Sequence, residues 1–218
     1  MGIKDRIKDY GWFVCTALNR TPLGIRNHPR ATVVVIPGIY EGRTQLMPLA
    51  RSLHEAGYQV EIIGELAMLT KPTAKLARIV AQRVATIPGP VVLLAHSKGG
   101  LVGASVLESH DKLLNLAGMV AIATPWQGSS LAQFFPPNSP VRRLAPDGLD
   151  LAIQQRQNCD LSRIYSLIPR SDPHVPNGSY LPGAHNIRLT SSGHFFPLGT
   201  AETKSLVHES LRRLLTSR

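Results

Sequence analysis

The stretch that decides the fold is VVLLAHSKGGL, residues 91–101. Its opening residues are apolar, as in a strand buried on both faces, and Ser97 follows between the small residues Ala95 and Gly99. Small residues on either side of the serine permit a strand-to-helix turn so sharp that a larger Cβ would clash. Such a turn aims the hydroxyl out of the sheet and places the next N–H at a helix start, where it can face an oxyanion. The pattern predicts a nucleophilic serine, although a small-residue strand end is common in any α/β protein.

The rest of the chain alternates between short apolar runs and segments with helical spacing. The expected strands are residues 31–37, 58–63, 91–95, 116–123, 161–169 and 186–190, and the expected helices are residues 45–57, 73–87, 99–109 and 201–215. Strands this rich in Val, Ile and Leu are typical of a parallel sheet covered by helices on both faces. We therefore expect an α/β fold with a mostly parallel sheet of about six strands.

Length and composition favour one main domain. A chain of 218 residues that is 43% hydrophobic can bury one substantial core. We expect that domain over residues 31–218, after an N-terminal helical extension over residues 1–30. No run approaches the ~18 apolar residues of a spanning helix, and the N-terminus lacks a signal-peptide pattern, so we expect a cytoplasmic protein. Cys15 and Cys159 are too few for a disulfide framework or a metal site, and we expect both to be buried, with no cofactor and no metal.

The charge balance restricts the partners. The formal net charge is +10, which suits nucleic acid, anionic membranes or acidic substrates. The basic residues are scattered, however, and aromatic residues make up only 6% of the chain. These features disfavour a nucleic-acid partner. Weak contact with a membrane surface stays open.

Two later loops carry the partners that a nucleophilic serine needs. Asp172 follows the strand expected over residues 161–169, and His194 follows the strand expected over residues 186–190. In this order His194 would take the serine proton, and Asp172 would hold the imidazole tautomer. His174 is the rival base, but it lies too close to Asp172 along one loop. We expect backbone N–H groups of Ile39 and Lys98 to hold the oxyanion. The Lys98 side chain is expected to reach solvent or a neighbouring carboxylate.

Several motifs together resemble a known family. The segments AHSKGG (95–100), PGI (37–39), TPWQGS (124–129) and LPGAHNIRLTSSGHFFPL (181–198) resemble those of small α/β-hydrolases, in particular compact bacterial lipases of the Bacillus lipase A type. The resemblance implies an α/β-hydrolase fold with a minimal lid or none. It also implies a serine esterase or lipase that acts through an acyl-enzyme. Pro37 stands where His is usual, and Lys98 where Met is common.

The irregular section over residues 125–160 is expected to lie near the active site as an insertion. Its apolar side chains could line a pocket or belong to a surface loop. The candidate substrate-binding residues are Tyr40, Trp126, Phe134, Phe135 and Phe195. We expect a monomer that acts on a small-molecule or lipid ester. The same residues would also serve a thioesterase or an acyltransferase, and a catalytically silent binding protein would keep the fold without turnover.

The N-terminal extension shows helical spacing of its own. Its apolar side chains fall on one face: Ile3, Ile7, Tyr10, Val14, Ala17 and Leu18. Its charged side chains fall away from that face: Lys4, Asp5, Lys8 and Asp9. The pattern predicts that the apolar stripe packs against the main domain.

Overall fold

A computed structural model of the chain describes residues 2–16, 23–42, 44–109, 113–154 and 160–216. Six strands form one parallel sheet in the order β2-β1-β3-β4-β5-β6. The strands are β1 (Thr32–Ile36), β2 (Gln59–Ile62), β3 (Val91–His96), β4 (Leu116–Ile122), β5 (Ile164–Ile168) and β6 (His185–Arg188). The expected α/β architecture with a parallel sheet is confirmed.

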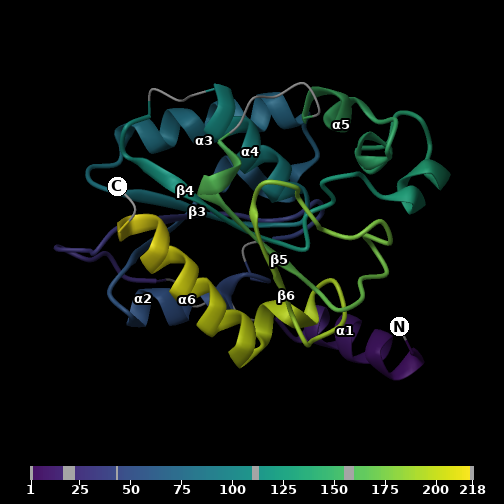
Figure 1. Ribbon diagram of the computed structural model, residues 1–218, viewed down its shortest axis with the longest axis horizontal. Coiled ribbons are helices and arrows are strands. Elements are labelled where there is room, and N and C mark those ends of the chain that lie inside the picture. Colours follow the sequence, from purple (N-terminus) through teal and green to yellow (C-terminus); the bar gives the residue numbers. More distant parts are fainter. Residues whose placement is uncertain (1, 17–22, 43, 110–112, 155–159, 217–218) are drawn as a thin grey trace.

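Helices cover both faces of the sheet. The helices are α1 (Ile3–Thr16), α2 (Met47–Glu55), α3 (Thr73–Thr86), α4 (Lys98–Ser109), α5 (Leu149–Gln154) and α6 (Ala201–Thr216). Figure 1 shows α3 and α4 on one face and α2 and α6 on the other. Each pair of helices buries an apolar cluster against the sheet. None of the described helices is both long and apolar enough to cross a bilayer.

Burial along the strands follows their place in the sheet. Every residue of β1, β3, β4 and β5 is buried, as expected for strands covered on both faces. The edge strands β2 and β6 are only partly buried. β5 begins later than the sequence pattern predicts, because residues 161–163 form a 3-10 turn. The Asp160 carboxylate starts that turn by accepting a hydrogen bond from the Ser162 N–H.

The section over residues 125–160 is irregular, as its composition predicts. It contains 3-10 turns at Ser130–Phe134 and Arg142–Leu144 and the short helix α5. The sequence pattern misses α5 because six residues are too few to show a helical period. No long lid lies over the sheet in the described part of the chain. The division into residues 1–30 and 31–218 stays a prediction.

The strand order reverses direction between β1 and β3. The chain leaves β1 toward β2 on one side and returns to β3 on the other, so their carboxyl ends flank a switch point, where ligands bind in open α/β sheets. The two segments pack closely there. A Cβ on Gly99, in the first turn of α4, would lie 2.4 Å from the carbonyl oxygen of Ile36 at the end of β1. Glycine is therefore required for α4 to start at this point.

Helix α1 packs with the opposite face from the one its apolar spacing predicts. Asp9 is completely buried, and Trp12 and Phe13 are half-buried, whereas Ile3 and Ile7 are 76% and 69% exposed. The prediction is wrong because hydrogen bonds to Asp9, described below, fix the orientation of the helix. Ala17 and Leu18 lie outside the described residues. Cys15 is exposed rather than buried, and Cys159 also lies outside the described residues.

A buried ion pair joins α4 to α5. The Lys98 ammonium lies 3.1 Å from Asp150 Oδ2 and donates a hydrogen bond to the Lys71 carbonyl at 2.9 Å. Of the two destinations expected for this side chain, solvent and a carboxylate, it reaches the carboxylate. Burial lowers the pKa of the Lys98 ammonium, and Asp150 offsets only part of that effect. The second oxygen of Asp150 accepts the Thr73 N–H at 3.2 Å, so one carboxylate links three helices.

We predict that Lys98→Met lowers the free energy of unfolding by about 3 to 5 kcal/mol, because it leaves the Asp150 carboxylate buried without a partner charge. The double variant Lys98→Met/Asp150→Asn should recover at least half of that loss, since the amide still accepts the Thr73 N–H without carrying a charge. Urea unfolding of the parent and both variants measures this. A Lys98→Met variant as stable as the parent would contradict the role given to the ion pair.

Candidate active site

Ser97 occupies a strained turn between β3 and α4. Its φ is +52°, a value that is uncommon for residues other than glycine and that costs of order 1–3 kcal/mol. Two hydrogen bonds hold the turn: the Ser97 N–H donates to the Ile122 carbonyl at 2.9 Å, and the Gly100 N–H donates to the Ser97 carbonyl at 3.0 Å. The neighbouring strand and the first turn of α4 thus keep the serine at the carboxyl end of the central strand.

Asp172 and His194 form a buried pair. His194 Nδ1 lies 2.7 Å from Asp172 Oδ2, and both side chains are about 5% exposed or less. Burial alone would lower the pKa of His194, but the Asp172 carboxylate outweighs it and the pKa lies above its usual value. Burial alone would raise the pKa of Asp172, and the contact with His194 outweighs it in the opposite direction. The pair is thus built to stabilise an imidazolium beside a carboxylate.

The rival histidine lies beside this pair but is engaged elsewhere. The ring of His174 stacks on that of His194, with centroids 4.8 Å apart, and its Nε2 is 2.9 Å from the Tyr10 hydroxyl. Burial, followed by the nearby His194, lowers the pKa of His174 to about 4. The carboxylate of Asp172 turns one oxygen to His194 and accepts the His174 backbone N–H with the other. The acid therefore serves the His194 ring and only the backbone of His174.

Ser97 and His194 face the same cavity, which has a volume of about 400 Å³. Its walls are largely apolar and include Phe13, Ile39, Tyr40, Leu131, Ala132, Phe135, Val141, Leu144, Val175 and Phe195. In the described chain no hydrogen bond joins Ser97 Oγ directly to His194. Catalytic hydrogen bonds of this kind are often long until a substrate binds.

The candidate substrate-binding residues separate into two groups. Tyr40, Phe135 and Phe195 line the cavity. Trp126 instead lies in the core, where its indole N–H donates to the Ser166 hydroxyl at 2.9 Å. Phe134 is 87% exposed and is not among the lining residues.

The two amides expected to hold an oxyanion are available. Within the described chain neither the Ile39 N–H nor the Lys98 N–H has an acceptor. Lys98 is the first residue of α4, whose initial N–H groups have no partner within the helix. Ile39 lines the cavity together with Ser97, and a Cβ on the preceding Gly38 would lie 3.0 Å from Ser97 Cβ. The loop after β1 therefore lies directly against the serine.

A buried histidine and a buried glutamate support this loop. His96 Nδ1 lies 2.7 Å from Glu41 Oε1, and the other carboxylate oxygen accepts the Gly38 N–H at 2.9 Å. His96 Nε2 lies 3.0 Å from the His194 carbonyl. Both ring nitrogens of His96 thus face oxygen atoms. Burial alone would raise the pKa of Glu41, but His96 outweighs it and the pKa is lowered.

A second buried carboxylate, Asp9 of α1, holds the histidine loop. It accepts three consecutive backbone N–H groups, those of His194 at 3.0 Å, Phe195 at 2.7 Å and Phe196 at 2.6 Å. Gly193, with φ +118°, permits the approach, because a Cβ there would lie 2.4 Å from Asp9 Oδ1. A carboxylate on consecutive N–H groups makes strong, charge-assisted hydrogen bonds.

These contacts form one network that sequence patterns do not reveal. It runs from the Gly38 N–H through Glu41 and His96 to the His194 carbonyl, and from the His194 N–H to Asp9. His96 lies within the AHSKGG motif, but nothing in the motif indicates its partners. Glu41, His96 and His194 each offer one atom that can ligate a metal ion, and these atoms lie within 4.8 Å of one another. In this structure those residues hydrogen-bond to one another or to Asp172.

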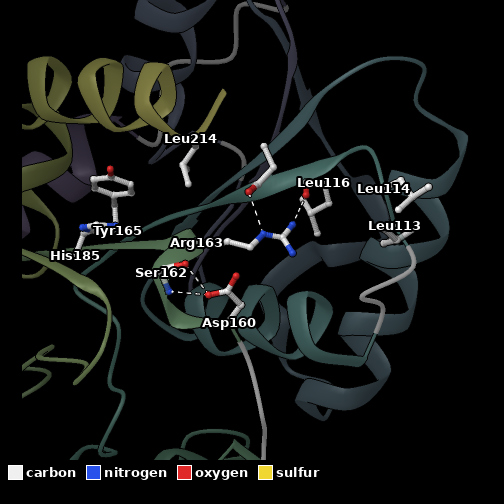
Figure 2. Close-up of a pocket in the computed structure, with 10 residues that line it drawn as sticks. Leu113, Leu114, Leu116, Asp160, Ser162, Arg163, Tyr165, His185 and Leu214 are labelled. Atoms are coloured by element: carbon white, nitrogen blue, oxygen red, sulfur yellow. Dashed lines mark hydrogen bonds between the residues drawn. The ribbon is translucent and has the colours of Figure 1, made fainter. Parts of the chain in front are cut away.

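A second cavity lies at the amino ends of the strands, opposite to Ser97, near the start of β4 and β5 (Figure 2). Its polar groups serve the fold. The Arg163 guanidinium donates to the carbonyls of Leu116 and Ala117, and the Asp160 carboxylate accepts from Ser162. This cavity has no strained nucleophile and no acid–base pair among its lining residues, so the cavity at Ser97 is the better candidate.

No family model and no curated protein matches the sequence, but solved structures match the fold. Bacillus licheniformis lipase BlEst2 in its mature form has a TM-score of 0.70 and 17% identity over 88% of this chain and 96% of that one. The metagenomic carboxyl esterase MGS0156 has a TM-score of 0.64 and 16% identity, over 90% of this chain and 78% of that one. The ydeN gene product of B. subtilis has a TM-score of 0.60 and 17% identity, over 85% of this chain and 99% of that one. The chain thus has the α/β-hydrolase fold, shared with lipases and esterases.

Proposed function

We propose that the protein is a serine hydrolase of carboxylic esters that acts through an acyl-enzyme. One observation carries the proposal: the strained Ser97 and the buried Asp172–His194 pair converge on a single apolar cavity. A positive φ is strained for a serine, and in a strand-to-helix turn this conformation aims the hydroxyl out of the sheet. Lipases and esterases are among the structures with the same fold, which agrees with this class.

The proposed reaction follows from the roles that the geometry permits. His194 Nε2 takes the proton of Ser97 as the hydroxyl oxygen attacks the ester carbonyl, and the Ile39 and Lys98 N–H groups bind the resulting oxyanion. His194 then gives the proton to the departing alkoxide, which leaves as an alcohol, while the acyl group stays bound to Ser97 as an ester. Water, deprotonated by His194, attacks this ester in the same way, and the carboxylic acid and free Ser97 are released. Asp172 holds the Nδ1–H of His194 throughout and stabilises the imidazolium.

The walls of the cavity indicate which part of the substrate it binds. They are mostly aliphatic and aromatic, and Ser97 and His194 are among the polar residues that line them. Burial of an apolar acyl chain in such a cavity contributes to binding, and the polar lining residues orient the ester at the serine. We therefore expect esters with an apolar acyl chain to be hydrolysed in preference to esters with a charged acyl group. Comparing p-nitrophenyl esters with acyl thioesters of the same chain length separates an esterase from a thioesterase.

Ser97→Ala should lower the turnover of p-nitrophenyl esters by roughly three or more orders of magnitude, because the nucleophile is lost while the fold remains. Ser205→Ala, an exposed position on α6, is the matched control and should keep the parent rate. A Ser97→Ala variant that hydrolyses esters at the parent rate would refute the proposed nucleophile.

The rate should depend on pH through His194. Only the neutral imidazole can accept the serine proton, and its pKa is raised, so kcat/KM should rise with pH through a pKa above the usual histidine value. Asp172→Asn removes the charge that raises it. That variant should lose about 10⁴-fold in kcat and shift the acidic limb to lower pH. An unchanged limb in the variant would assign the titration to another group.

Asp9 should act as a positioning residue through the histidine loop. Asp9→Ala leaves three N–H groups without an acceptor, two of them buried, and should lower the free energy of unfolding by about 3 kcal/mol. Asp9→Asn keeps an acceptor, so it should fold better, yet a displaced His194 should still lower kcat by about 10- to 100-fold. The acidic limb should also move to lower pH, since Asp9 is one of the charges that raise the pKa of His194.

Asp5→Asn, on the same helix, is the matched control for Asp9→Asn. Asp5 accepts only a backbone N–H at the exposed start of α1. The Asp5→Asn substitution should therefore leave the pH profile and kcat unchanged. If Asp9→Asn behaves like Asp5→Asn in both, Asp9 has only a structural role.

A further inference from the structure

The outward face of α1 carries an apolar stripe that is largely exposed, and Tyr10 in it also contacts the main domain, through His174 and Phe195. Ile3, Ile7 and Val14 are 76%, 69% and 65% exposed, and Tyr10 is 47% exposed. Their spacing places all four on one side of the helix. The inward face is already occupied by Asp9, Trp12 and Phe13. We call these four exposed residues the outer stripe of α1.

The charges around the outer stripe are cationic. At 100° per residue, Lys4 and Arg6 lie on opposite flanks of the stripe, and both are exposed. The acids of the helix point away from it: Asp9 is buried, and Asp5 is half-buried and hydrogen-bonded to the start of the helix. Because the structure turns the acids inward, the exposed surface of α1 combines apolar residues with positive charge.

Tyr10 connects the outer stripe to the wall of the cavity. Phe13 of α1 lines the cavity. The Tyr10 hydroxyl hydrogen-bonds to His174, which also lines the cavity. Leu131 and Phe135 line the cavity from the irregular section and are each 46% exposed, with the 87% exposed Phe134 between them in sequence. Figure 1 shows α1 and this section on the same side of the molecule. Exposed apolar side chains thus come from two segments far apart in the sequence.

We propose that this surface docks on an anionic lipid surface. A helix that lies in a membrane interface buries an apolar stripe and places Lys and Arg beside the headgroups, which matches α1. A second copy of the chain fits less well, since pairing two stripes would bring their Lys4 and Arg6 residues together. The net charge of +10 adds long-range attraction to anionic lipid. In this docked state the cavity wall that Phe13 and His174 line would lie beside the lipid.

The experiment measures co-sedimentation of the full chain with vesicles of phosphatidylcholine, alone or mixed with phosphatidylglycerol. We expect binding to the mixed vesicles that weakens as salt rises. Ile7→Ser/Val14→Ser and Lys4→Glu/Arg6→Glu should each lower the partition coefficient by about tenfold or more. Circular dichroism and thermal unfolding check that both variants fold; a misfolded pair is replaced by the single variants Ile7→Ser and Lys4→Glu, held to the same expectation.

Matched control variants carry the same changes elsewhere. Ile25→Ser removes a side chain that is 91% exposed near the start of the sheet, and Lys75→Glu/Arg78→Glu reverses two exposed charges on α3. Ile25→Ser should bind as the parent does. Lys75→Glu/Arg78→Glu lowers the net charge as much as Lys4→Glu/Arg6→Glu does, so it should lose only the long-range part of the attraction and bind more tightly than that variant. Equal binding by the α1 variants and the controls would overturn the proposal, as would absence of binding by the full chain. Dimerisation that Ile7→Ser/Val14→Ser abolishes, without vesicle binding, would overturn it in favour of a second copy. Because the readout is binding, the result is independent of the proposed ester hydrolysis.

Discussion

The candidate site depends on two buried carboxylates that hold backbone N–H groups on opposite sides of it. Glu41 fixes the loop after β1 through the Gly38 N–H, and Asp9 fixes the loop after β6 through three consecutive N–H groups. His96 joins the two halves by contacting Glu41 with one ring nitrogen and the His194 carbonyl with the other. A buried carboxylate is costly unless its hydrogen bonds are complete, so each of these loops has one favoured position.

This network explains why α1 belongs to the site although it lies far from it in the sequence. The helix packs on the 3-10 turn Phe196–Gly199 and on Phe195, whose ring centroid is 4.5 Å from that of Phe13. Its inward face therefore supports His194, and its outward face is left apolar and cationic. One helix thus links the proposed chemistry to the proposed lipid surface.

The alternation of apolar runs and helical spacing was enough to predict the sheet, because a parallel sheet imposes that pattern on every strand. The order of Ser97, Asp172 and His194 along the chain likewise follows from the fold, and the structure places the Asp172 and His194 side chains 2.7 Å apart. The orientation of α1 could not be predicted, since the apolar period of the helix indicates the stripe and not the Asp9 carboxylate. The partner groups of Asp9 lie 185 to 187 residues away, and no local pattern marks them. Trp126 shows a similar limit: its residue type suits a pocket or a core, and only its contact with Ser166 decides for the core.

The most direct measurement of the central claim is mass spectrometry of the protein after reaction with a fluorophosphonate, which modifies only an activated serine. We expect one adduct per chain, on the peptide that contains Ser97, and slower labelling when Asp9 or Asp172 is changed to asparagine. Absence of labelling, or labelling of another serine, would contradict the proposal that this network activates Ser97.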